Sequence, residues 1–394
     1  MASSDYYIQD NADIESQKSE AAKGLYQAGD YRSALRLYLD LLNSEFSYKL
    51  CYEIGRCYYK LEDMDNAELY FTRSVSLEEY KNPSYLYLGN IFYRKQEISK
   101  AIEYWITSYS YKPDDESVCL NLATSYFSKG MKFYSVYFYG KYLKYAKDKA
   151  SSHYTEIKKS LEEFSKIGDS FYKKALRAVS MNDNETAIQA LDYAVKNFPT
   201  HFDVNNLLGK IYYDKKDYEH ALKYLEQAFC LDSKSVDILK KLSSVMIYLG
   251  DITGAYCCLK RMLPLVISHQ KDYYDIIKTT KELETRFDIN RTNKHAALAE
   301  KYYADNNYYL ALFEYENCII LNNNLAYDYD NIIQKIKLFL HPEERIIKTC
   351  MEKGALFHSE GDFKKSNRYF SKIVTLADEN SQEYKLAKSR IVNV

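Results

Sequence analysis

Small and apolar residues recur along the chain at intervals of about 34 residues. The segment that starts at Tyr85 reads Tyr85-x2-Leu88-Gly89-x2-Phe92, then Ala101-x3-Trp105. Segments that begin at Cys51 and at Cys119 repeat the same order of residue types. The apolar positions fall at helical spacing, so each segment predicts two amphipathic helices joined by a short turn.

Two positions of the repeat hold small residues throughout. The small residue of the second helix sets the frame: Ala34, Ala67, Ala101, Ser135, Ala187, Ala221, Ala255, Ala311 and Ser366. The eighth position of the first helix is then Ala22, Gly55, Gly89, Ala123, Ala175, Gly209, Ser243, Ala299 and Gly354. Small residues at both places predict that two antiparallel helices cross there at close range. Nine units follow, beginning near residues 15, 48, 82, 116, 168, 202, 236, 292 and 347.

The turn between the two helices also repeats. Its residues are Gly29-Asp30, Gly130, Asn182-Asp183, Gly250-Asp251, Asn306-Asn307 and Gly361-Asp362. Gly and Asn accept the left-handed conformation that ends a helix, and Asp caps the helix that follows.

This order of aromatic, Leu-Gly, Tyr, Ala, Phe and Pro residues resembles the tetratricopeptide repeat. The resemblance implies an all-α, right-handed superhelical α-solenoid of about nine helix pairs, with inserted helices and a C-terminal capping helix. The match is weaker in the fifth unit, which has Lys174 and Ala178 where apolar and aromatic residues are usual, and in the ninth, which has Lys353 at the Leu position.

The spacing of the units divides the chain. Three intervals interrupt the repeat, and apolar residues at helical spacing predict one inserted or lengthened helix in each. The predicted order is a flexible N-terminus at 1–13, units one to four at 14–149, an inserted helix at 150–167, units five to seven at 168–269, an inserted helix at 270–291, unit eight at 292–325, an inserted helix at 326–346, unit nine at 347–380 and a capping helix at 381–394. The interval 150–167 also suits a hinge between two blocks of repeats.

Composition narrows the partners. The 54 Lys and Arg residues balance 55 Asp and Glu, which gives a net charge of -1 and no general attraction to nucleic acid or an anionic membrane. The sequence begins without a secretory signal and contains no long apolar run, so membrane insertion is not expected. Eight Cys without a CxxC pair favour the reducing cytoplasm. Tyrosine is abundant, with 43 copies.

No pattern in the chain points to catalysis. The phosphate-binding, dinucleotide-binding, nucleophile-elbow and zinc-protease motifs are absent, and the His residues have no metal-ligand spacing. The adjacent Cys257 and Cys258 are interpreted as small packing residues. We therefore expect a protein that is not an enzyme and that binds no cofactor and no metal.

The resemblance implies a concave groove lined by positions 2, 5, 6, 9, 12 and 13 of the first helices. The candidate partner-binding residues on these positions are Lys23, Tyr26, Arg56, Tyr59, Lys60, Asn90, Tyr93, Arg94, Asn121, Phe127, Lys210 and Tyr213. Two interpretations of the aromatic positions stay open: a ladder that grips a peptide, or rings that pack between neighbouring helices. The cations either attract an acidic peptide or form ordinary solvated surface, partly cancelled by Glu20 and Glu53.

Some tetratricopeptide repeat proteins hold a terminal carboxylate in a clamp of Lys, Asn, Asn, Lys and Arg. Asn90 and Asn121 match its two Asn positions, but Leu86 replaces the first Lys, and only Lys173 is suitably placed among the later cations. Without those cations we do not expect chaperone docking through such a clamp.

The favoured function is a non-catalytic protein–protein interaction module or assembly scaffold that binds an extended or helical segment in the groove. The alternative is a peptide-responsive regulator that changes superhelix shape when a ligand binds. Open solenoid ends and exposed tyrosines would also allow self-association.

Overall fold

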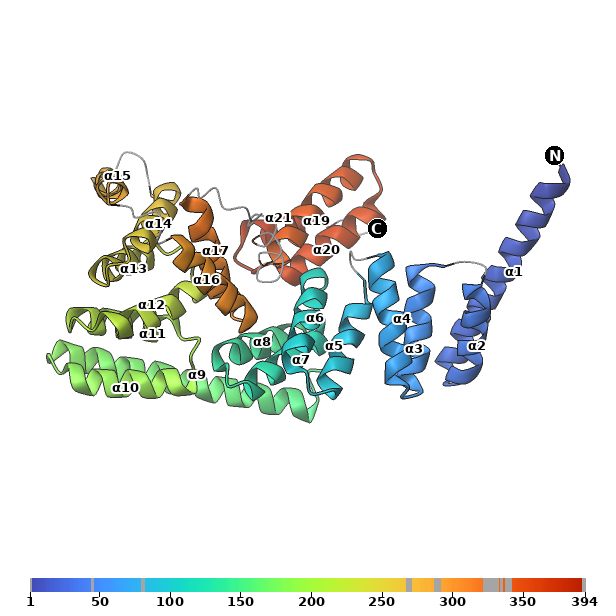
Figure 1. The fold of residues 1–394 in the computed structure, drawn as a ribbon, viewed down its shortest axis with the longest axis horizontal. Coiled ribbons are helices and arrows are strands. Elements are labelled where there is room, and N and C mark those ends of the chain that lie inside the picture. The colour runs from blue at the N-terminus through green and yellow to red at the C-terminus, as the bar shows by residue number, and fades with distance from the viewer. Residues whose placement is uncertain are drawn as a thin grey trace. The chain divides into compact units, whose positions relative to one another are not determined.

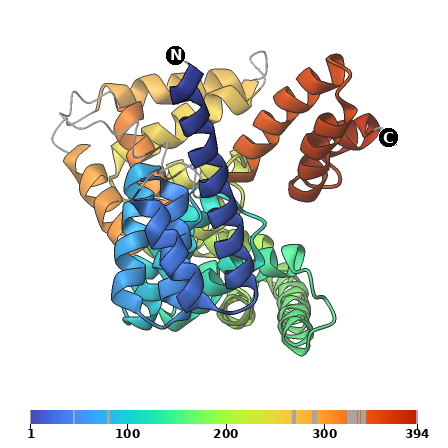
Figure 2. The same ribbon diagram turned by 90° about the vertical axis from the view of Figure 1, so that its right-hand side faces the viewer.

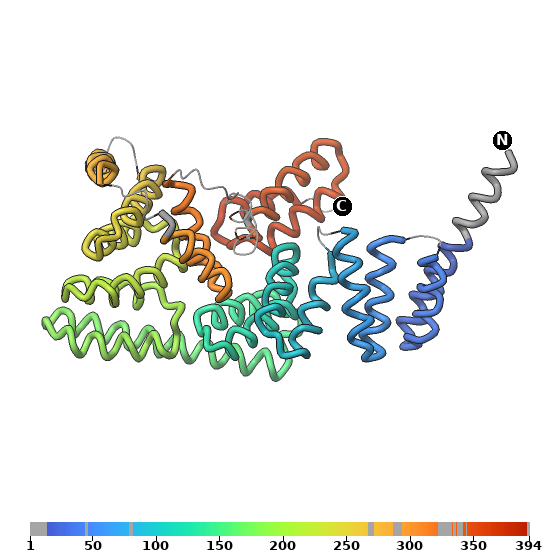
Figure 3. Tube along the Cα trace, in the orientation of Figure 1, coloured from blue at the N-terminus to red at the C-terminus, as the bar shows by residue number. Residues whose placement is uncertain are grey.

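The computed structural model describes residues 2–43, 46–78, 82–266, 271–286, 292–321, 333, 336 and 342–391, and every regular element in these ranges is helical. The chain divides into two compact units, Met1–Pro113 and Asp114–Val394. Helices follow one another in antiparallel pairs, which can be traced by label in Figure 1 and along the tube in Figure 3. Each helix packs most extensively on its partner in the pair.

Three helix pairs fall in the described part of the first unit. They are α1 (Ala2–Gln27) with α2 (Tyr31–Leu42), α3 (Tyr48–Lys60) with α4 (Met64–Leu77), and α5 (Ser84–Arg94) with α6 (Ile98–Tyr111). The side chains of α1 are described from Ile14 onward, so the flexible N-terminus predicted for residues 1–13 stays a prediction.

Six further pairs fall in the described part of the second unit. They are α7 (Glu116–Ser128) with α8 (Lys132–Tyr145), α9 (Ser152–Ser180) with α10 (Asn184–Asn197), α11 (Phe202–Asp214) with α12 (Tyr218–Leu231), α13 (Val236–Tyr248) with α14 (Ile252–Met262), α16 (Thr292–Ala304) with α17 (Tyr308–Ile320), and α19 (Pro342–Ser359) with α20 (Phe363–Leu376). The antiparallel course of α19 and α20 is visible in red in Figure 2. The last described helix is α21 (Gln382–Arg390), which packs on α20.

The small residues explain why the helices can pair so closely. All residues at the two predicted small positions are buried. A Cβ atom added to Gly55 would lie 2.8 Å from the Phe71 ring, and one added to Gly89 would lie 2.4 Å from Trp105. A larger side chain at either glycine would therefore force the two helices apart.

The turns follow the predicted chemistry. The six predicted turn residues all have positive φ: Gly29, Gly130, Asn182, Gly250, Asn306 and Gly361. Asp30, Asp183, Asp251 and Asp362 then cap the next helix, each accepting a backbone N–H three residues on. Three other turns place Glu62, Gln96 and Lys216 in the left-handed region, which no feature of the sequence indicated.

The three interruptions differ from one another. Residues 152–180 form one helix of 29 residues, α9, so the interval 150–167 mostly lengthens the first helix of unit five. The interval 270–291 contains a separate helix, α15 (Lys271–Glu284), which packs on α14 and follows a short 3-10 turn at Leu263–Leu265. The helix predicted over 326–346 falls largely outside the described residues.

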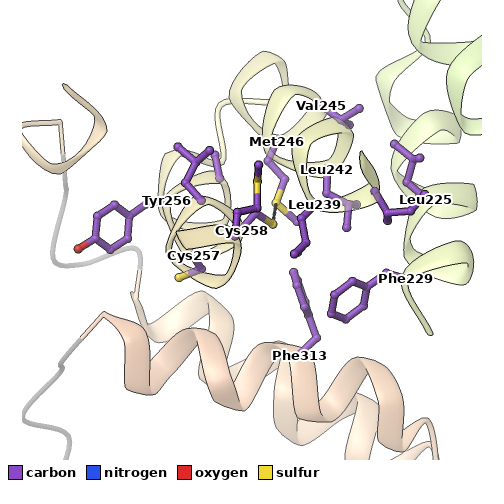
Figure 4. Packing of buried hydrophobic residues seen from close by; sticks show 14 of the residues in the cluster. Leu225, Phe229, Leu239, Leu242, Val245, Met246, Tyr256, Cys257, Cys258 and Phe313 are labelled. Carbon is purple, nitrogen blue, oxygen red and sulfur yellow. Dashed lines mark hydrogen bonds between the residues drawn. The ribbon is translucent and has the colours of Figure 1, made fainter. Parts of the chain in front are cut away.

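An apolar core of the second unit lies where α12, α13, α14 and α17 meet (Figure 4). The rings of Phe229 and Phe313 meet edge to face with centroids 5.0 Å apart. Cys258 contacts the Met246 sulfur at 3.8 Å, and both side chains are buried. Cys257 and Cys258 therefore serve as packing residues, as the sequence suggested.

Candidate interaction surfaces

A cavity of about 590 Å³ lies between the first three helices of the chain. The lining residues are Glu15, Ser16, Ser19, Glu20 and Lys23 on α1, Tyr38 and Leu41 on α2, Ser47 just before α3, and Lys49, Leu50 and Glu53 on α3. Several of these, such as Ser16, Ser19 and Lys49, occupy the repeat positions expected to face the groove. The cavity is large enough to receive side chains of a bound peptide.

The charges around this cavity are balanced locally. Lys23 lies 3.5 Å from Glu20, and Arg56 lies 2.8 Å from Glu53, each pair on one helix. Lys49 is the other lining cation, and Glu15 the other lining anion. The lining is thus mixed in charge, which gives an acidic peptide no general advantage.

Two of the candidate tyrosines pack against arginines from the next repeat. The Arg56 guanidinium lies 4.1 Å from the Tyr26 ring centroid, and that of Arg94 lies 5.2 Å from the Tyr59 ring. Tyr59 also meets Tyr87 edge to face at 5.3 Å. Burial raises the pKa of Tyr26, which Arg56 partly offsets. These rings join successive first helices, and each arginine covers the face of the ring before it.

Tyr93 keeps more of its surface free. It is 44% exposed, with its ring centroid 5.6 Å from that of Trp105. The Trp105 indole Nε1 donates a hydrogen bond of 3.0 Å to the Asn90 side-chain oxygen. Asn90, one of the two residues that matched the carboxylate clamp, therefore has its oxygen engaged inside the repeat. Lys60 is exposed at the end of α3.

The remaining candidates belong to the second unit. Phe127 is 64% exposed on α7, where Asn121 is half-buried. On α11, Lys210 is exposed, and Tyr213 lies beside Tyr248 with ring centroids 6.0 Å apart. These residues thus lie on two different helix pairs, α7 with α8 and α11 with α12.

A tyrosine-rich joint between α8 and α17 was not foreseen. The Tyr134 hydroxyl donates to the Asn307 side chain and accepts the Tyr309 backbone N–H at 3.4 Å. The Tyr134 and Tyr309 rings stack at 5.9 Å, and Tyr137 meets Tyr309 edge to face. Repeats that are far apart in sequence are therefore in contact within the second unit. The sequence feature that could have indicated this contact is the set of aromatic residues that α8 carries outside the repeat positions.

Polar contacts extend this joint. Lys129 donates to the Asn306 side chain at 2.7 Å, and Lys144 donates to the Leu376 carbonyl at 2.9 Å. Lys141 pairs with Glu343 at the start of α19. The fourth helix pair thus contacts both the eighth and the ninth, which a simple nearest-neighbour array would not do.

A cavity of about 150 Å³ adjoins the joint. The lining comes from α8, α12 and the start of α17: Phe133, Tyr134, Lys223, Glu226, Gln227, Cys230, Asn307 and Leu310. Burial raises the pKa of Glu226 to about 8, and the nearby Glu314 carboxylate adds to the effect. The Gln227 side-chain oxygen has no hydrogen-bond partner among the described residues.

The cysteines of the described residues are free thiols, and most of them are buried. Burial raises the pKa of the Cys57 and Cys258 thiols to about 12, and it raises those of Cys119, Cys230 and Cys257 as well. Such thiols stay protonated and poorly nucleophilic at neutral pH. Over the described ranges, no group of His, Cys, Asp and Glu is arranged to hold a metal ion. No described helix combines the length and apolar character needed to cross a bilayer.

Antiparallel helix pairs that cross at small residues, repeated along the chain, define an α-solenoid repeat protein. Family models described as tetratricopeptide repeat match residues 48–80 and residues 172–232. The matched segments cover α3–α4 and most of the span from α9 to α12. These two segments of the chain are therefore tetratricopeptide repeats.

Similarity to individual proteins is weaker. BBSome complex member BBS4 from Bos taurus is 24% identical over 113 residues, which are 28% of this chain and 22% of BBS4. This chain therefore matches less than a quarter of the length of that relative. Among solved structures, a tetratricopeptide repeat protein from Parabacteroides merdae is 12% identical, covering 68% of this chain and 98% of the other, with a TM-score of 0.33. The P58(IPK) TPR domain is 15% identical, covering 96% and 98%, with a TM-score of 0.27.

Proposed function

We propose that the chain is a non-catalytic scaffold that holds a segment of a partner protein on the concave face of its first unit. The observation that supports this most directly is the cavity between α1, α2 and α3, lined by Ser16, Ser19 and Lys49 at groove positions. A protein–protein interaction module is also the role in keeping with its tetratricopeptide repeats.

The lining suggests how a segment would be held. Leu50 offers apolar contact, while Lys49 and Glu15 offer charged groups of both signs. A segment with one apolar anchor and flanking polar residues fits such a lining, because anchors in desolvated pockets supply most of the binding energy. The free thiols and the balanced charge suit a cytoplasmic protein partner rather than a nucleic acid.

The test fills the cavity without deleting any contact. Ser19→Trp places a large ring in the cavity, and Gln17→Trp places the same ring on an exposed position of α1 that does not line it. Both variants and the wild type are used for affinity purification from the source cell with quantitative mass spectrometry. We expect Ser19→Trp to reduce capture of specific partners at least tenfold and Gln17→Trp to leave it unchanged. Retention of every partner by a correctly folded Ser19→Trp protein would contradict the proposal.

A second candidate is a regulator that changes shape when a peptide binds. The joint between α8 and α17 favours it, since Tyr134, Asn307 and Tyr309 form a discrete contact that can open or stay closed. The lengthened helix α9 supplies a place where the chain between the joined repeats could bend.

Small-angle scattering separates the two candidates. Profiles are recorded with and without a peptide selected for binding, for the wild type and for Tyr134→Phe. A regulator predicts a peptide-dependent change that Tyr134→Phe enhances or mimics. Identical profiles in all four samples support a passive scaffold.

A further inference from the structure

Two helices of the second unit face each other across an open groove of about 360 Å³. From α8, Val136 and Tyr139 line it; from α9, Ile157, Leu161 and Phe164 do so. The three α9 residues follow the i, i+4, i+7 spacing of a single helix face. The groove thus presents an apolar strip about two helical turns long, roughly 10 Å.

The groove exists because α9 is lengthened. Its lining residues on α9 all precede Gly168, where the fifth repeat begins. The packing between α8 and α9 is sparser than the packing between α10 and α11 or between α12 and α13. Phe127 and Phe164 remain 64% and 38% exposed at its edge. The interval 150–167 lies outside the regular repeat units. It adds an apolar surface to α9 that the neighbouring helices leave partly exposed.

Charge on the rim indicates what would cover it. Lys132 and Lys196 both line the groove, and the Lys132 ammonium lies 3.4 Å from the Lys196 backbone carbonyl. Within the described part of the chain, neither ammonium has an ion-pair partner. Glu156 is the one lining carboxylate. The α10 side of the rim is therefore positive and favours an acidic partner.

We propose that this groove docks an amphipathic helix of a partner protein. The helix would carry large apolar side chains at i and i+4 or i+7 and acidic residues at the end that meets Lys132 and Lys196. The apolar residues fill the strip between α8 and α9, and the carboxylates pair with the two ammonium groups.

A second copy of the chain fits this groove less well. Two-fold association would bring the same patch from each copy together, including Lys132 and Lys196 twice over. The added like charge opposes that contact. A dimer that forms through the groove would therefore overturn the proposal.

The groove is a second site and belongs to the second unit, whereas the cavity of the proposed function belongs to the first. The cavity filled by Ser19→Trp lies on α1, and the groove lies between α8 and α9. Loss of one site leaves the other intact, so the two proposals fail separately.

The experiment uses a displayed library of 16-residue helical peptides, with apolar residues randomised on one face and acidic, basic or neutral residues at the ends. Full-length protein selects the binders, and fluorescence anisotropy measures the selected peptides. We expect acidic amphipathic peptides to be enriched. Phe164→Asp should weaken their binding at least tenfold, while Leu176→Asp, on an exposed position of the same helix outside the groove, should not.

Charge reversal tests the rim. Lys132→Glu is on an exposed side chain, so it should fold normally and shift the preference from acidic to basic peptides by at least tenfold in relative affinity. Enrichment of basic peptides on the wild type would overturn the proposal. So would selected peptides that bind Phe164→Asp as tightly as wild type, or a concentration-dependent dimer that Phe164→Asp abolishes in analytical ultracentrifugation.

Discussion

The Glu226 carboxyl should make the second unit less stable as pH rises. This carboxyl lines the cavity beside the α8–α17 joint. The same cavity is also lined by Lys223 and Cys230 from α12 and by Tyr134 from α8. Tyr302 of α16 and Glu314 of α17 are near enough to interact with its charge. Replacing Glu226 by Gln keeps the shape of the protonated acid and removes the titration.

The sign of the effect follows from the direction of the pKa shift. The pKa of Glu226 is about 8 in the fold against an ordinary value of 4.5. Below pH 4.5 the group is protonated in both states and costs nothing. Between pH 4.5 and 8 the unfolded chain ionises while the folded chain does not, so stability falls across this window. Above pH 8 the loss is complete.

The magnitude follows from 1.36 kcal/mol for each pKa unit, which gives a cost of about 3 kcal/mol at pH 7 and about 5 kcal/mol above pH 8. Water that enters the cavity screens the charge and lowers both values. We therefore expect Glu226→Gln to gain about 1 to 3 kcal/mol at pH 8.5, and less than about 1 kcal/mol at pH 5.

Urea unfolding followed by far-UV circular dichroism at pH 5, 7 and 8.5 measures this difference. Hydrogen exchange on α12 peptides locates the effect in the second unit. Glu219→Gln, an exposed change on the same helix, is the control and should behave like wild type at each pH. A Glu226→Gln advantage that is absent or independent of pH would refute the reasoning.

Three further substitutions test the packing. Gly89→Val adds a branched side chain where even a Cβ lies 2.4 Å from Trp105, so we expect a loss of about 1–3 kcal/mol and a red-shifted tryptophan emission. An unchanged spectrum would contradict that close contact. Tyr134→Phe removes the hydroxyl that donates to Asn307, and should cost about 1 kcal/mol in urea unfolding; no cost would mean that the joint does not close in solution. Asn82→Ala removes a buried amide that donates hydrogen bonds to two backbone carbonyls at 2.8 and 2.7 Å. It should lower the free energy of unfolding, measured by tryptophan fluorescence, by about 1–3 kcal/mol. An unchanged free energy of unfolding would show that water can replace these hydrogen bonds.

The helix pairs could be predicted from sequence because their cause is local. Gly55 and Gly89 must be small since the facing ring belongs to the same repeat, so one 34-residue segment contains the whole constraint. The turn at Gly250 is predictable for the same reason. Glu62 and Lys216 adopt the same left-handed turn without a favourable residue, because the two flanking helices fix the geometry and the side chain only tolerates it.

The candidate site was predictable only in part. Helical periodicity puts Tyr26 and Tyr59 at the same position of successive first helices, but it cannot show that Arg56 and Arg94 cover their rings. The contact of Tyr134 with Tyr309 joins residues 175 apart, far beyond the reach of a pattern that relates neighbouring repeats. The groove beside Phe164 depends on how closely α9 packs on α8, and the sequence of neither helix specifies that packing.

Tyrosine suits joints between helices that also carry polar groups. In the α8–α17 joint, the Tyr134 ring stacks on Tyr309 while its hydroxyl satisfies Asn307, which no aliphatic side chain could do. A ring committed in this way has little surface left for a partner. The aromatic residues best placed for recognition are therefore those that the fold leaves exposed, such as Tyr93 and Phe127, and the lengthened helix α9 adds Phe164 to that set. Exposed aromatic surface is therefore left both at regular groove positions, by Tyr93 and Phe127, and at the interruption of the repeat, by Phe164, because the contacts within the array do not cover these three rings.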